Sequence, residues 1–251
     1  MSFMSINNLM LTRKLRLTIA ILSFSCIFSV TAADQSKTRV LPQEKAELSN
    51  SSVRILVDKK DPYLMIKEVA SNTFNRFAAE EQAIKANPNL LKDIVREELI
   101  PYINYKYAAF KVIGKHYKKV SKQELKAFVP VFREYLITSY AQVFTLYDKQ
   151  KVEFAPSKKF SDKRIVAVGT IIIMPGRENI DVSFKVRKNK KTNEWKAYDL
   201  VAEGVSLLDS KQAELGGIIR QKGLSYVTEL LKKKSSRKII FKDKSTHTKV
   251  S

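Results

Sequence analysis

The chain has 251 residues, with 46 lysines and arginines against 25 aspartates and glutamates, which gives a formal net charge of +21. This balance favours anionic partners such as nucleic acid, acidic lipid headgroups or a membrane surface, although a solvated lysine-rich surface has the same composition. One cysteine and two histidines leave no material for zinc clusters or for Ser-His and Cys-His catalytic sets, and P-loop, G-x-G-x-x-G and H-E-x-x-H motifs are missing.

The N-terminus is predicted to be a secretory signal peptide over residues 1–33. Basic residues precede an apolar run, Leu17–Val30, and small residues allow cleavage after Ala33 or one residue earlier. The run is short for a transmembrane span. An uncleaved anchor and a lipoprotein signal at Cys26 are the alternatives. We expect an exported, soluble, periplasmic chain that retains no cysteine.

The mature chain is predicted to hold one folded domain between two polar extensions. Residues 34–60 are polar and broken, and they are expected to form a flexible N-terminal arm. Residues 61–234 form the domain, and residues 235–251 form a basic C-terminal tail.

Helices dominate the first half of the domain. Apolar residues at three- and four-residue steps predict helices from Asp61 to near Lys85, over 89–103 and over 104–116, and Pro101 should break or bend the second. Ser121 and Glu124 form a capping box, S-x-x-E.

The capping box opens a long helix whose apolar positions run from Phe128 to Tyr147. Pro130 lies inside this stretch and should kink the helix or mark a first-turn boundary.

The period then changes to two, which predicts strands. Four strands are expected, over 151–156, 164–174, 179–189 and 194–208. The chain closes with helical segments around Ser210–Arg220 and Leu224–Lys233, separated by Gly223. The order of helices, antiparallel meander and short helices predicts an α+β domain.

Few residues offer catalytic chemistry. His116 is expected near a helix end and His247 in the tail. Asp199 and Glu203, four residues apart, could form a carboxylate dyad, or they could hydrogen-bond turns and pair with basic residues. Nucleic acid is disfavoured because the aromatic residues fall on faces expected to be buried.

The apolar faces have two interpretations. Ala167 and Gly169 lie inside an otherwise bulky strand and leave room for a close neighbour. That neighbour could be a packed helix, or the helices and the sheet could enclose a ligand between them. Periodicity alone leaves both open.

Four blocks of the sequence resemble one known family. They are "ELIPYINYKYAAFKVIGKHYK" (98–118), "FREYLITSYAQVF" (132–144), "WKAYDLVAEGVSLL" (195–208) and "RQKGLSYVTEL" (220–230). Together these blocks resemble the MlaC family of periplasmic phospholipid-binding proteins of the maintenance-of-lipid-asymmetry pathway, also called the toluene-tolerance auxiliary transport family. The resemblance covers roughly residues 61–231.

The resemblance implies a curved antiparallel four-stranded sheet wrapped by helices around an apolar lipid cavity, distantly like the nuclear-transport-factor fold. It implies a non-enzymatic carrier with phospholipid as cargo and no cofactor. The implied protein partners are the substrate-binding subunit of an inner-membrane ABC transporter and an outer-membrane lipoprotein–porin complex, with no nucleic acid. The alternatives are a small periplasmic isomerase or hydrolase on a similar fold and an adaptor that binds no lipid.

The residues expected to line such a cavity face inward by period on the surrounding elements. From the helices they are Tyr107, Phe110, Phe132, Leu136, Tyr140, Val143 and Phe144, and from the strands Val166, Val168, Ile172, Val182, Phe184, Tyr198 and Leu200.

Overall fold

The computed structural model describes residues 54–241. The predicted signal peptide, residues 34–53 of the predicted arm and residues 242–251 of the tail lie outside the described residues. In chain order the elements are α2 (Pro62–Ala79), α3 (Glu81–Ala86), α4 (Leu90–Ile94), the π-helix η1 (Val95–Leu99), the 3₁₀-helix η2 (Ile100–Tyr102), α5 (Tyr105–Ile113), the 3₁₀-helix η3 (Gly114–Lys119), α6 (Lys122–Phe144), β1 (Val152–Phe154), β2 (Ile165–Ile172), β3 (Ile180–Lys188), β4 (Trp195–Ala202), β5 (Val205–Ser206) and α7 (Leu207–Ser235).

The first predicted helix is divided in two. The carboxylate of Asp61 accepts hydrogen bonds from the amides of Tyr63 and Leu64 and so caps α2. Glu80 leaves helical geometry, and α3 starts immediately after it.

The second predicted helix changes its winding before it ends. Pro101 has no N–H to donate to the carbonyl of Glu97, and its ring crowds that carbonyl. The turns before and around it are accordingly the π-helix η1 and the 3₁₀-helix η2.

The capping box at the start of α6 is confirmed. The hydroxyl of Ser121 accepts from the amide of Glu124 at 3.1 Å, and the Glu124 carboxylate accepts from the amide of Ser121 at 3.0 Å. No new helix starts at Pro130, because α6 continues through it to Phe144. Pro130 is exposed, so water can reach the carbonyl that it leaves without a partner.

The strands form one antiparallel meander with the order β1-β2-β3-β4-β5. The expected α+β class is confirmed, but the sheet has five strands where four were predicted. The last predicted strand folds back on itself at Glu203 and Gly204, which have φ angles of 51° and 76°. This tight turn lets Val201 pair with Ser206.

The C-terminal helix has the predicted interruption. Gly223 has a φ of 80° inside α7, a backbone conformation that glycine adopts more readily than other residues. Two helical segments meet at this residue. Beyond α7, Ile239 is buried and its amide donates to the Asn89 side chain at 3.0 Å. The packed chain therefore extends past residue 235.

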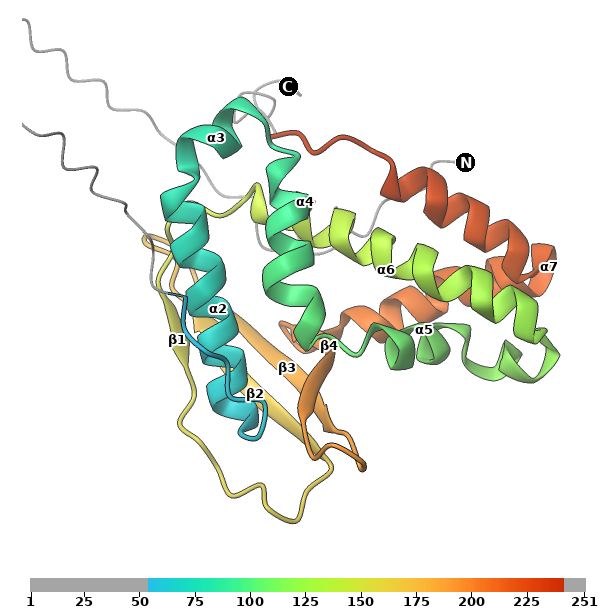
Figure 1. Ribbon diagram of the computed structural model, residues 1–251, viewed down its shortest axis with the longest axis horizontal. Coiled ribbons are helices and arrows are strands. Elements are labelled where there is room, and N and C mark those ends of the chain that lie inside the picture. The colour runs from blue at the N-terminus through green and yellow to red at the C-terminus, as the bar shows by residue number, and fades with distance from the viewer. Residues whose placement is uncertain (1–53, 242–251) are drawn as a thin grey trace, which may run out of the picture. The chain divides into compact units, whose positions relative to one another are not determined.

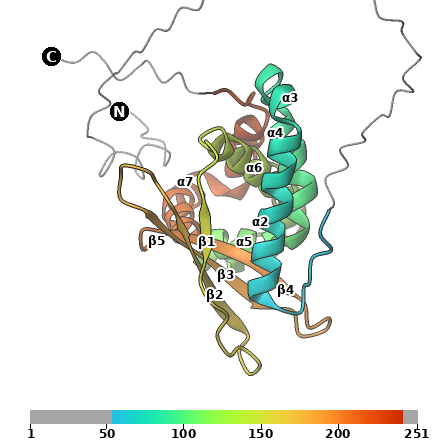
Figure 2. The same cartoon turned by 90° about the vertical axis from the view of Figure 1, so that its left-hand side faces the viewer.

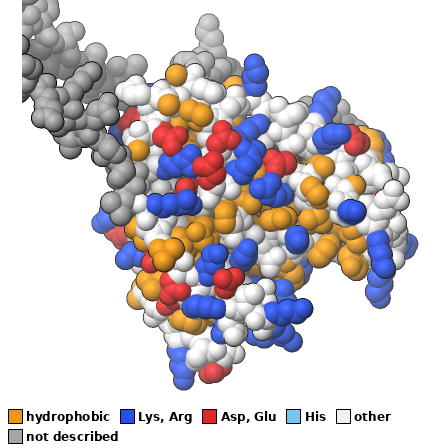
Figure 3. Space-filling model, in the orientation of Figure 1, with side chains coloured by type: hydrophobic (Ala, Val, Ile, Leu, Met, Phe, Trp, Pro, Cys, Tyr) orange, Lys and Arg blue, Asp and Glu red, His pale blue; other side chains and the backbone are white. Residues whose placement is uncertain are grey.

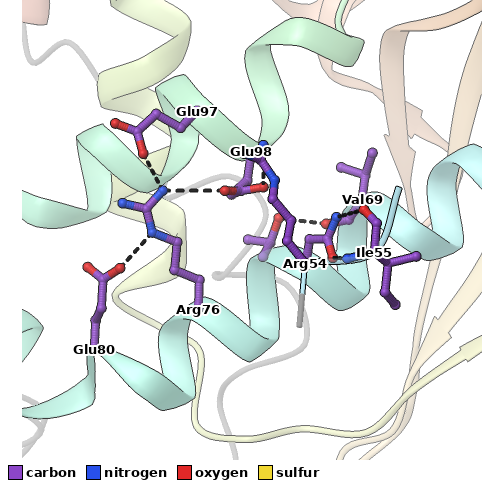
Figure 4. Close-up of polar contacts among 9 residues, drawn as sticks. Arg54, Ile55, Val69, Arg76, Glu80, Glu97 and Glu98 are labelled. Carbon is purple, nitrogen blue, oxygen red and sulfur yellow. Dashed lines mark hydrogen bonds and ion pairs between the residues drawn. The ribbon is translucent and has the colours of Figure 1, made fainter. Parts of the chain in front are cut away.

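The segment before α2 is also held in place (Figure 4). The side chain of Asn72 exchanges two hydrogen bonds with the backbone of Ile55, at 2.9 and 2.8 Å. Arg54 lies 3.2 Å from the buried carboxylate of Glu98, which Arg76 also reaches from α2. These contacts fasten residues 54 and 55 to α2 and to η1.

Helices lie on both sides of the sheet's last long strand. Figures 1 and 2 show α2 lying along the sheet, and α2 contacts β2 and β4. The helices α5 and α7 also contact β4. None of the helices in residues 54–241 is both long and apolar enough to cross a membrane.

Candidate functional site

The hydrophobic core is divided into three separate clusters of buried residues. The helical cluster joins α5, α6 and α7 around Phe128, Phe132 and Leu215. The α2–α4–α6 cluster contains Phe77 and Ile94. The sheet cluster holds α2 on the sheet around Met65, Val168, Val186 and Trp195. A domain of this size usually has one contiguous core, so the boundaries between these clusters are the first place to look for a site.

One face of the sheet is largely apolar, with Thr170 as a buried polar residue on it. The register places Val168, Phe184 and Leu200 side by side on β2, β3 and β4, with Val182 one step along the same face. The sheet cluster covers only part of this face, because Val182 and Leu200 belong to none of the three clusters. Ile172 is also outside them.

A second apolar stripe lies on α6. Leu136, Tyr140 and Phe144 are four residues apart and share one side of this helix. All three are only partly buried and border the clusters. In the described part of the chain α6 packs mainly on α7, and also on α5, α4 and η1, and no strand is among its main neighbours.

Tyr140 is the residue of this stripe that comes under the electrostatic influence of β4. Burial raises the pKa of Tyr140 to about 12, and the negative charge of Asp199 on β4 adds to the shift. Its hydroxyl makes no hydrogen bond with any residue between 54 and 241, although the side chain is partly accessible. The ring therefore lies largely inside the protein, packed against the α2–α4–α6 cluster and close enough to Asp199 on β4 to feel its charge.

We call these seven residues the seam. It consists of Leu136, Tyr140 and Phe144 on α6 and Ile172, Val182, Phe184 and Leu200 on the sheet.

The other seven predicted lining residues lie elsewhere. Phe132 is fully buried in the helical cluster, while Val166 and Val168 are buried under α2 in the sheet cluster. Tyr107 and Tyr198 contact each other edge to face, with ring centroids 5.0 Å apart.

Two of the predicted residues are largely on the surface. Phe110 on α5 is 39% exposed and Val143 on α6 is 51% exposed.

Sequence reasoning also missed residues on the seam's side of the sheet. The register places Val152, Ile180 and Ala202 on the same face as Ile172 and Val182. Strict alternation along β3 and β4 could have identified Ile180 and Ala202. Val152 needed the pairing of β1 with β2, which periodicity does not give.

The carboxylates that could have formed a catalytic dyad have structural partners. Buried Asp199 accepts from the Ser206 hydroxyl at 2.7 Å and from the Leu208 amide at 3.0 Å, and it lies 2.9 Å from the Lys185 ammonium. It thus caps α7. Glu203 accepts from the Asp181 amide at 2.8 Å in the turn between β4 and β5.

The geometry of the seam offers apolar burial. Among the described residues, no group of three or more His, Cys, Asp or Glu side chains could hold a metal ion. What the seam can accommodate is hydrocarbon, because its side chains are aliphatic or aromatic.

Comparison with known proteins gives a consistent family. The profile of the MlaC protein family matches residues 67–233. The intermembrane phospholipid transport system binding protein MlaC of Haemophilus influenzae is 34% identical over 189 residues, which is 75% of this chain and 88% of that protein.

A solved structure shares the fold. The phospholipid-binding protein of Ralstonia solanacearum, determined in complex with a phospholipid, superposes with a TM-score of 0.62 at 18% identity, over 70% of this chain and 97% of that one. The family profile and the Haemophilus relative show that the chain belongs to the MlaC family.

Proposed function

We propose that this chain is a periplasmic phospholipid carrier that holds acyl chains along the seam. The observation that carries the proposal is the division of the core into three clusters with partly buried apolar side chains at their borders. The relative from Haemophilus is named as a phospholipid transport binding protein, and the structural neighbour was solved with a phospholipid.

The energetics suit a carrier without catalysis. Burying hydrocarbon is worth about 0.8 kcal/mol per methylene, so a sixteen-carbon chain gains on the order of 12 kcal/mol relative to water. A bilayer offers nearly the same gain, so transfer between the protein and a membrane can be close to balanced. The protein removes the cost of exposing bare chains to water, and no reacting group is needed.

Loading requires the clusters to separate. The two clearest hollows of the described residues measure about 260 and 410 Å³ and lie away from the seam, against α5 and η3. A phospholipid therefore enters between α6 and the sheet, at the borders of the clusters, where no strand of the described chain is among the main neighbours of α6.

The cargo is expected to pass between two membranes. We propose export by the N-terminal signal, docking on the substrate-binding subunit of an inner-membrane ABC transporter, and exchange with an outer-membrane lipoprotein–porin complex. The transporter's ATPase would supply direction, and the outcome would be maintained lipid asymmetry. Asp199 and Glu203 act in capping and turns in this scheme and perform no catalysis.

The test is the lipid content of the purified chain and of two matched variants. Organic extraction followed by mass spectrometry should yield stoichiometric phospholipid from the wild type. Leu200→Glu places a charge in the seam, so this variant should fold but carry no lipid.

Leu215→Glu is the matched control, since Leu215 is fully buried in the helical cluster. This variant should fail to fold, as judged by circular dichroism. The proposal is abandoned if the wild type is empty, or if Leu200→Glu keeps its lipid or unfolds as Leu215→Glu does.

A further inference from the structure

The outer side of α5 and η3 carries aromatic side chains that the fold does not bury. The inner side of α5 is fully used, because Ala108, Ala109, Val112 and Ile113 pack in the helical cluster. Phe110, on the opposite side, is 39% exposed. Its ring meets the ring of Tyr117 edge to face at 5.6 Å, and Tyr117 is 47% exposed. Exposed aromatic pairs on a folded surface indicate an interaction site.

Lysines surround this aromatic pair. We use "outer face" for Lys106, Phe110, Lys111, Lys115, Tyr117 and Lys118, all of which are exposed. Between residues 103 and 120 the sequence has five lysines and no aspartate or glutamate. Among residues 54–241, none of these lysines forms an ion pair. Figure 3 shows hydrophobic side chains bordered by lysine and arginine side chains over the region where Figure 1 places α5.

Basic hollows extend the positive surface at both ends. At the start of α5, a hollow of about 260 Å³ is lined by Lys106, Arg187 and Lys196, with Glu194 as its carboxylate. Burial lowers the pKa of Lys196, and the nearby charges of Lys59 and Lys106 lower it further. These cations repel one another, so an anion placed here would relieve the repulsion.

The second hollow lies beside η3. It measures about 410 Å³ and is lined by Lys115, Lys119 and Arg220, with Glu124 as its carboxylate. Lys106 belongs to both the outer face and the first hollow, and Lys115 belongs to both the outer face and the second hollow.

We infer that the outer face docks this chain on the surface of an anionic phospholipid membrane. Aromatic rings enter the boundary between headgroups and acyl chains, while lysines remain at the level of the phosphates. The charge is carried mainly by lysine, a flexible point charge that suits headgroups of variable position better than a fixed bidentate partner. The inference does not require the chain to carry lipid, because docking and cargo use different residues.

The first test is co-sedimentation of the full mature chain with vesicles. The wild type should bind vesicles of phosphatidylcholine with about 30 mol% phosphatidylglycerol far better than phosphatidylcholine alone, and high salt should reverse this binding. Each lysine near an anionic surface contributes about fivefold in affinity, so the double variant K111E/K118E should bind at least about 25-fold more weakly.

The matched control is K232E/K233E on the last turn of α7, which has the same net charge as K111E/K118E. It should bind within a few-fold of the wild type. Phe110→Ser leaves the charge unchanged and should weaken binding about tenfold by removing the ring. The inference is overturned if the two double variants bind equally, or if Phe110→Ser binds like the wild type.

A fluorescence measurement identifies which anionic partner binds the outer face. Tyr117→Trp adds an exposed indole to a chain whose Trp195 is fully buried and gives a constant background. Its emission should shift to shorter wavelength with anionic vesicles. A shift seen only with duplex DNA or an acidic protein, and not with vesicles, rejects the membrane. Lipid extraction from the same variants should show unchanged cargo, which separates failure of docking from failure of the carrier function.

Discussion

Tyr140 is partly accessible, yet its phenol is strongly affected by burial. Burial raises its pKa from 10.0 to about 12, so the folded state holds the phenolic proton more tightly than the unfolded chain does. Its contribution to stability is therefore complete below about pH 10 and is lost as the pH rises towards 12.

Tyr140→Phe should remove the one tyrosine of the seam. Tyrosinate absorbance of the variant, subtracted from that of the wild type, should give a single step centred near pH 12. Tyr140→Phe should also lose less stability than the wild type between pH 10 and 12, because it has no phenol to ionise. If the difference between wild type and variant is instead a step centred near pH 10, the ring faces bulk water. That result would contradict the assignment of Tyr140 to the seam.

The sequence identified the apolar face of the sheet but not how much of it is covered. Alternation along β3 placed Val182, Phe184 and Val186 together, as the register has them. Only the structure shows that α2 covers Val186 and leaves Val182 outside the packed clusters. Which helix lies over which half depends on long-range packing that period-two patterning does not contain.

For the helices, the sequence pattern likewise leaves open which side is buried. On α5 the small residues Ala108 and Ala109 take the inner side, and this forces Phe110 outward. A stripe of large aromatic residues predicts an apolar face, but close helix packing favours small residues there. Residue size, rather than hydrophobicity alone, would have been the better guide.

At the scale of elements, charged contacts hold the π-helix η1 to α2 (Figure 4). Arg76 reaches Glu80, Glu97 and Glu98, and Glu98 also meets Arg54. The Glu98 side chain is 6% exposed and that of Glu97 is 56% exposed. The wide turn of η1 presents Glu98 towards α2, where it balances two guanidinium groups.

Glu98→Gln should therefore destabilise the fold by about 2 kcal/mol, because it removes the charge of the buried carboxylate that both Arg54 and Arg76 contact. Glu97→Gln loses an exposed ion pair with the same arginine and should cost less than about 1 kcal/mol. Urea denaturation of the two variants gives the comparison. Equal losses would mean that the buried carboxylate has no special role in joining η1 to α2.

The junction of α5 and η3 depends on glycine. Gly114 has a φ of 55° and a ψ of −128°, a region that L-residues avoid, and a Cβ there would also meet the side chain of Gln212. Gly114→Ala should therefore lower the free energy of unfolding by about 1–3 kcal/mol.

Gly217 is the matched control inside α7. It has no positive φ, and no atom lies within 4 Å of an added Cβ. Gly217→Ala should raise stability by about 0.5–1 kcal/mol through helix propensity. Thermal unfolding of both variants tests the pair, and a stabilising Gly114→Ala would refute the strain argument.

Elements that depend on a short stretch of sequence could be predicted. Elements that depend on pairing or packing with a distant part of the chain could not. The capping box at Ser121, the break at Gly223 and the three long strands follow from short stretches of sequence. The two-residue strand β5 exists only because the turn at Glu203 and Gly204 returns the chain to β4. The π-helix reflects competition between Pro101 and tertiary packing, for which sequence has no simple signature.

For the whole molecule, three clusters in place of one core mean that the parts can separate without each losing its own packing. The helical cluster and the sheet cluster are each complete around fully buried aromatic residues, Phe128 and Trp195. Opening the seam therefore exposes mainly partly buried side chains, since Val182 is the one buried residue of the seven. The proposed carrier function requires this property, because cargo would have to enter between the clusters while each of them stays folded.

Cargo should in turn stabilise the folded state, since a ligand that binds only that state shifts unfolding by mass action. At lipid concentrations about a thousandfold above Kd the gain is about 4 kcal/mol, and for a domain of this size that corresponds to a Tm shift of roughly 8–16 °C. Scanning calorimetry before and after delipidation should show this decrease in the wild type. Leu200→Glu, which is expected to carry no lipid, should show no further decrease. If delipidation leaves the wild-type Tm unchanged, the acyl chains do not bridge the three clusters, and the seam is not where this protein holds its cargo.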